Sequence, residues 1–193
     1  MMHQIKHLLV GSYAGIFITV VGGFILQPAP FLHYSHSGLS FYGNYFPTAI
    51  PFVLGLFISA VCLAMAALSL PDGQGRLGTM RRLLLALSGG FVVIVLTPVQ
   101  ANVLLYWAHT FAAIYLFAAG AAGALWAMSY AGRTVADWFF FGIFVLGFLL
   151  SFLSASFVHL LGFLALGQVL ALNGGALVLF RVMMRWTAHG AED

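Results

Sequence analysis

Long apolar runs that recur along the whole chain are the feature that most constrains its fold. A helix that crosses a membrane needs about 20 consecutive, mostly apolar residues, and only 6% of the 193 residues are charged. A soluble domain carries about a quarter, so the solvent for most of this surface must be lipid. We predict an all-α integral membrane bundle of six helices in one domain, residues 1–193, with spans at 8–26, 48–70, 83–99, 103–130, 135–154 and 158–181.

The last two spans share one continuous apolar run. The stretch from Val135 to Met184 is too long for one crossing and long enough for two. Three serines and His159 lie near its middle, and we predict that the chain turns there.

Basic residues predict the orientation, because the cytoplasmic loops of membrane proteins carry an excess of Lys and Arg. With six spans all seven basic residues fall on one side, and the loops on the other side carry no formal charge. We therefore predict that both termini are cytoplasmic, and the compact loops favour the inner membrane of a bacterium. The basic residues are Lys6, Arg76, Arg81, Arg82, Arg133, Arg181 and Arg185.

Small residues inside the spans indicate close helix packing, since lipid gives helices no hydrophobic reason to associate. Gly11 and Gly15 form a GxxxG pair in the first span, 118–124 contains only Ala and Gly, and Gly174 and Gly175 are adjacent in the last span. We interpret these positions as contacts between helices of one chain. Gln168 and Asn173 are polar within the last span, and we expect them to form interhelical hydrogen bonds.

Acidic residues are too few and too poorly placed for most membrane catalysis or transport. Asp72 and Asp137 are predicted to lie in cytoplasmic loops, which leaves no carboxylate inside a span for a proton-coupled carrier or for acid–base hydrolysis. No Gly-rich phosphate loop is present, and Cys62 has no second cysteine. The basic residues are spread over helix ends rather than gathered in one patch, which excludes nucleic acid as the expected partner.

Four of the seven histidines are predicted to lie at similar depth on the outer face: His33, His36, His109 and His159. Such a group is a candidate metal site, and His109 with His159 is the candidate catalytic pair and the one pair suited to haem. Amphipathic rings such as His are also common at the membrane interface without binding a metal, because they suit the headgroup region. We therefore do not favour haem or metal as a cofactor.

The segment between the first two spans, residues 27–47, is the most unusual in the chain. It reads QPAPFLHYSHSGLSFYGNYFP, with many aromatic residues and no formal charge. It is suited to act as a lid over a lipid cavity, as a docking surface for another membrane subunit, or as a cap on the bundle. The predicted lipid- or partner-binding residues are His33, His36, Tyr42, Asn44, Tyr45 and Asn102.

Residues Leu39–Pro47, LSFYGNYFP, match a pattern Ile-Ser-x-x-Gly-x-x-x-Pro, and an apolar helix follows them. A second pattern has a His with Gly-Ala three and four residues later. Here His109 has Ala112 and Ala113 at those positions. On these residues the chain resembles the DRAM/Sfk/FRAG-type superfamily of six-span membrane proteins and its bacterial relatives of unknown function. The family often has Asp where this chain has Phe41. The resemblance implies roles linked to lipids or to organising other membrane proteins, and no single reaction.

Three hypotheses follow for function. The first is a non-enzymatic multipass protein that binds lipid or serves as an accessory or scaffold subunit of a membrane complex. The second is an enzyme that acts on a lipid-linked substrate at the outer face through the outer histidines. The third is a protein that binds haem or a metal through the same histidines.

Overall fold

The computed structural model describes residues 2–29, 38–44, 46–73, 75–97, 102–130, 134–155, 158 and 160–188. This part of the chain forms six helices that are long and apolar enough to cross a membrane, and one short 3-10 helix, η1 (Leu39–Asn44). The long helices are α1 (Met2–Leu26), α3 (Ala49–Leu68), α4 (Arg76–Leu96), α5 (Val103–Tyr130), α6 (Val135–Ser154) and α7 (Leu164–Ala188). The predicted fold class, an all-α bundle of six spans, is confirmed.

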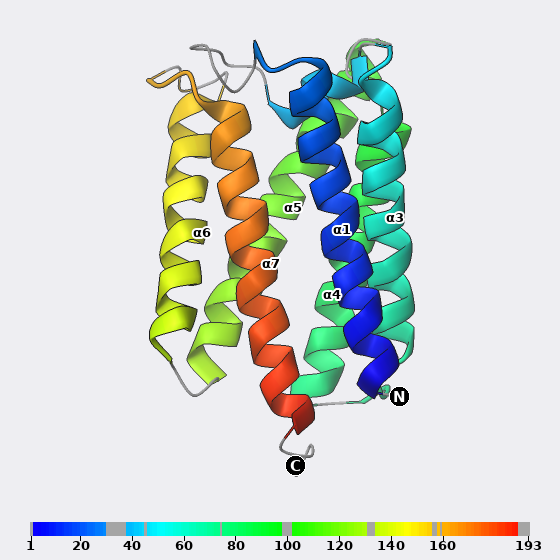
Figure 1. The fold of residues 1–193 in the computed structure, drawn as a ribbon, viewed down its shortest axis with the longest axis vertical. Coiled ribbons are helices and arrows are strands. Elements are labelled where there is room, and N and C mark those ends of the chain that lie inside the picture. Colours follow the sequence, from blue (N-terminus) through cyan, green and yellow to red (C-terminus); the bar gives the residue numbers. More distant parts are fainter. Residues whose placement is uncertain are drawn as a thin grey trace.

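The two ends of the bundle differ in charge. Both chain termini lie at the same end, drawn at the bottom of Figure 1. All charged side chains of the described residues are at this end, which we call the charged end: Lys6, Asp72, Arg76, Arg81, Arg82, Asp137, Arg181 and Arg185. The sorting of charge that the sequence predicts is therefore present in the fold.

The helices and the predicted spans differ mainly at the charged end. α1 begins at Met2 and α4 at Arg76, and both include basic residues ahead of their apolar runs. A helix continues beyond the hydrocarbon layer because its backbone hydrogen bonds do not depend on lipid. α7 starts at Leu164 rather than near 158, and the preceding turn is fixed by a hydrogen bond from the Phe163 N–H to the Ser154 hydroxyl, 3.0 Å long.

Glycines bring α1 and α3 into backbone contact. Gly15 and Gly55 face each other so closely that a Cβ on either would collide with the carbonyl oxygen of the other. The Ser59 hydroxyl donates to the Ser12 carbonyl across the same interface at 2.8 Å. The GxxxG pair Gly11 and Gly15 thus serves packing within the chain, as predicted.

A second tight pair is formed by α6 and α7. Gly147 and Gly167 face each other's helices here, and Gly174 lies against the backbone of Phe144. By contrast α1 and α7 touch at few residues, and α5 lies behind the space between them (Figure 1). The bundle therefore consists of two closely packed helix pairs, α1–α3 and α6–α7, held together by α4 and α5.

Replacing Gly55 with Leu should separate α1 from α3, because the new side chain would overlap the α1 backbone. Overpacking of this kind typically costs about 1–3 kcal/mol. Thermal unfolding in detergent measures the effect. Gly142→Leu on α6 is the matched control, since Gly142 is exposed and a Cβ there meets no atom within 4 Å; equal losses for both variants would contradict the packing role.

Candidate functional site

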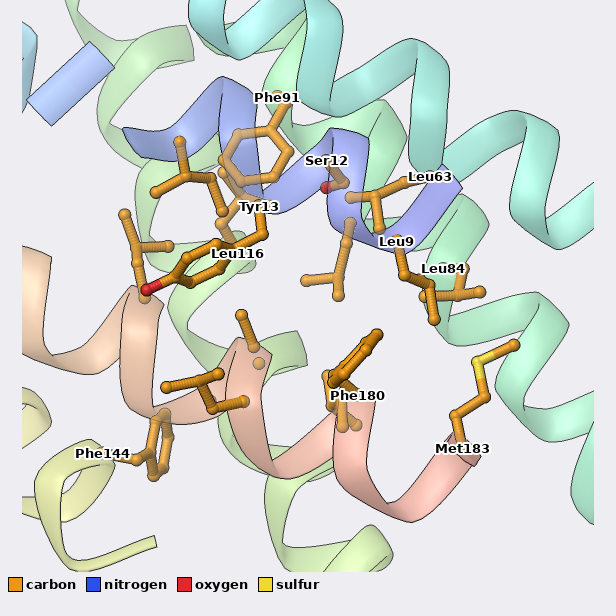
Figure 2. Close-up of a pocket in the computed structure, with 18 of the residues that line it drawn as sticks. Leu9, Ser12, Tyr13, Leu63, Leu84, Phe91, Leu116, Phe144, Phe180 and Met183 are labelled. Carbon is orange, nitrogen blue, oxygen red and sulfur yellow. The ribbon is translucent and has the colours of Figure 1, made fainter. Parts of the chain in front are cut away.

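The helix packing leaves a cleft open between α1 and α7. It has a volume of about 180 Å³, and α4 and α5 line it from behind. In Figure 2 the Tyr13 ring of α1 and the Phe180 ring of α7 extend into the space between their helices. Other lining residues include Leu9, Ile16, Met80, Leu84, Phe91, Leu116, Gly120, Phe144, Ala176 and Met183.

The surface of the cleft is almost entirely apolar. Ser12 and Tyr13 are the polar residues among those that line it. An apolar cavity of about 150 Å³ stays dry and accepts molecules such as benzene. The cleft is larger than that and is open along one side, where the lining residue Val10 is 49% exposed. A flexible hydrocarbon group is therefore the kind of ligand that it suits.

The cleft extends from the middle of the bundle toward the charged end. Its lining on α1 runs from Leu9 to Ile16, and on α7 it reaches Met183, close to the end of that helix. Gly120 of α5 lines the cleft, and a Cβ at this position meets no atom within 4 Å. The absence of a side chain at Gly120 thus adds to the open space.

A buried ionic cluster lies at the charged end of α6 and α7. The Asp137 side chain is 1% exposed and accepts hydrogen bonds from Arg181 Nε at 2.8 Å and Arg185 Nη1 at 2.7 Å. Thr134 completes a capping box, in which its N–H and hydroxyl both donate to Asp137 and its hydroxyl accepts from the Asp137 N–H. These contacts fix the start of α6 to the last turns of α7.

The prediction that Asp137 lies in a loop is wrong. Asp137 belongs to the first turn of α6, where a carboxylate interacts favourably with the helix dipole. A carboxylate removed from water needs charged partners, and two arginines supply them. The sequence signal was available, because Thr134-x-x-Asp137 before an apolar run is the pattern of a capping box.

Of the four outer histidines, only His109 lies within the described residues, and His33, His36 and His159 lie outside them. His109 is on α5, is 6% exposed, and has its Nδ1 2.8 Å from the Thr97 carbonyl oxygen at the end of α4. The ring therefore links α4 to α5. Asn102 is exposed, and its side-chain oxygen accepts from the Leu105 N–H at the start of α5.

The segment around η1 is fixed to the bundle at the end opposite the charges. Tyr42 is fully buried, and its hydroxyl donates to the Gln27 carbonyl at 2.9 Å. Burial raises the pKa of Tyr42 to about 12, so the phenol stays a neutral donor. The Thr48 hydroxyl donates to the Tyr42 carbonyl. Asn44 is half-buried, and Tyr45 lies outside the described residues.

The predicted interhelical hydrogen bonds of α7 are found for Gln168, which bonds the short helix η1, and not for Asn173. The Gln168 side-chain oxygen accepts from the Leu39 N–H at 2.6 Å, so Gln168 fixes η1 to α7. The Asn173 amide donates to the Val169 carbonyl of its own helix. Small hydroxyls also join helices, as in the bond from Ser88 of α4 to the Ala60 carbonyl of α3.

No family model, curated protein or solved structure matches this chain. The fold and its apolar helices define a multipass membrane protein of six helices. The resemblance to the DRAM/Sfk/FRAG-type superfamily stays a prediction. Within the described part of the chain no three His, Cys, Asp or Glu side chains gather into a group that could hold a metal ion.

Asp137→Asn should destabilise the protein, because it leaves two arginines near each other without their shared carboxylate. Removing one partner of a buried ion pair costs about 3–5 kcal/mol. The arginine side chains are 35% and 27% exposed, so we expect a smaller loss of about 2–3 kcal/mol. Thermal unfolding measures it, with Asp72→Asn as control, since Asp72 is 88% exposed in its contact with Arg81.

Proposed function

We propose that this protein binds a membrane lipid, with one hydrocarbon chain of the lipid in the cleft between α1 and α7. The observation that carries the proposal is the cleft itself, an apolar space of about 180 Å³ within the membrane-spanning part of the fold. The protein acts by holding the lipid, or by presenting it to other membrane subunits, and not by catalysis.

The surroundings of the cleft favour a lipid chain over a polar ligand. A site for a polar ligand needs several convergent polar groups, and Ser12 and Tyr13 are the polar residues that line this one. The exposed Val10 at the edge of the cleft supports an opening toward the lipid layer. A chain can therefore enter sideways from the bilayer without crossing water.

The charge of the nearer bundle end favours an anionic phospholipid. Among the described residues this end carries six cationic side chains and two carboxylates. Basic residues beside a span attract anionic headgroups, at about 1 kcal/mol for each Lys or Arg close to the surface. Because the cleft extends toward this end as far as Met183 of α7, one lipid can reach both features.

The membrane role agrees with the resemblance to six-span proteins linked to lipids or to organising membrane partners. His109 supports the enzymatic hypothesis less well, since the residue is 6% exposed and its Nδ1 contacts the Thr97 carbonyl. We further propose that both termini are cytoplasmic and that the host membrane is a bacterial inner membrane. The lipid would then come from the cytoplasmic leaflet.

Gly120→Leu should weaken lipid binding, because its side chain occupies the space that the hydrocarbon chain needs. A change of this size in an apolar pocket is worth about 10-fold or more in affinity. Native mass spectrometry of the protein in detergent with added phosphatidylglycerol or phosphatidylcholine measures the bound fraction. We expect the anionic lipid to bind more tightly to the natural sequence.

Gly142→Leu is the matched control, since this glycine is also unobstructed within a helix but does not line the cleft. It should bind lipid as the natural sequence does. If Gly120→Leu retained lipid to the same extent as Gly142→Leu, the cleft would not be the binding site.

The orientation can be tested with single cysteines in a Cys62→Ser background. Asp72→Cys lies at the charged end and Val103→Cys at the opposite end, and both positions are well exposed. A membrane-impermeant maleimide applied to intact spheroplasts should label the cysteine at 103 at once and the cysteine at 72 only after permeabilisation. The reverse pattern would overturn the proposed orientation.

A further inference from the structure

Two histidines that the sequence analysis did not single out lie one turn apart on the first turns of α1. His3 and His7 are both exposed, and their Nε2 atoms are 3.3 Å apart. The rings meet edge to face, with centroids 4.2 Å apart and an angle of 72° between their planes. The spacing i, i+4 places both rings on the same face of the helix.

The separation of the two nitrogens is that of neighbouring ligands around one metal ion. Imidazole nitrogens bind Zn²⁺ at about 2.0–2.1 Å in tetrahedral geometry, which puts two such nitrogens about 3.3 Å from each other. Without a metal, one ring must donate and the other accept at this contact. With a metal, both nitrogens act as electron-pair donors, and the rings rotate so that both lone pairs point at the ion.

We propose that His3 and His7 form a two-histidine site for a divalent transition metal at the charged end of α1. Imidazole ligands suit Cu²⁺, Ni²⁺ and Zn²⁺, and affinity for such sites generally peaks at Cu²⁺. No third His, Cys, Asp or Glu of the described residues joins the pair, so water occupies the remaining positions. This inference goes beyond lipid binding and does not depend on it.

This site is separate from the predicted outer histidines, both in its position and in how its ligands are held. It lies on a regular helix at the end that carries the charged residues, and its two ligands come from one turn. A metal ion that bridges them links two side chains across the first turn of α1, where the helix has unsatisfied N–H groups. The motif His-x-x-x-His at residues 3–7 was readable in the sequence.

The test uses the full-length protein in detergent with four other histidines replaced: His33→Ala, His36→Ala, His159→Ala and His189→Ala. This background keeps His3, His7 and the buried His109. Titration with CuSO₄ followed by calorimetry should give one Cu²⁺ per chain, and electron paramagnetic resonance should show two nitrogen ligands. His3→Gln and His7→Gln should each weaken binding about 10-fold or more, because the second linked ligand is lost.

Gln4→Ala is the matched control, since it changes an exposed neighbour that is not a ligand. It should leave the affinity and the spectrum unchanged. The proposal is overturned if the background protein binds no stoichiometric Cu²⁺, if the spectrum shows fewer than two nitrogens, or if either glutamine variant leaves binding unchanged.

Discussion

Close approach of helix backbones is the constraint on which this bundle depends. Lipid tails are as apolar as the helices, so burial of apolar surface does not hold the helices together. Packing therefore has to come from places where side chains are absent or small. Gly15 and Gly55 supply such a place between α1 and α3, and Gly147, Gly167 and Gly174 supply another between α6 and α7. Small hydroxyls such as Ser59 add hydrogen bonds that lipid cannot replace.

The candidate site is what this mode of packing leaves between the two pairs. Where α1 faces α7 no glycines interlock, and large apolar side chains such as Leu9, Phe180 and Met183 surround an open space instead. Cations and the exposed histidine pair gather at the same end of the bundle, whereas the end around η1 is tied down by uncharged contacts. The two ends of the molecule are thus built from different chemistry.

The sequence predicts the number of helices and the sorting of charge well, because both follow from hydropathy and from Lys and Arg positions. It also predicts that the glycines of α1 pack within the chain. It does not predict the cleft, since apolar residues that line a cavity and apolar residues that face lipid are the same residue types. The capping box at Thr134 and Asp137 is a local pattern, but the bonds of Asp137 to Arg181 and Arg185 join residues far apart in the sequence and are not predictable from it. The contact between His3 and His7 depends on their rotamers, which the spacing of four residues alone does not determine.

The hydrogen bond from the Leu39 N–H to Gln168 couples η1 mechanically to α7. α7 is joined to α6 along its length and by the Asp137 cluster at its far end, so the two helices form one stiff hairpin. This hairpin makes one wall of the cleft, and Gln168 connects the same hairpin to η1 on the opposite face. A displacement of α7 at this wall would therefore act directly on the bond that holds η1.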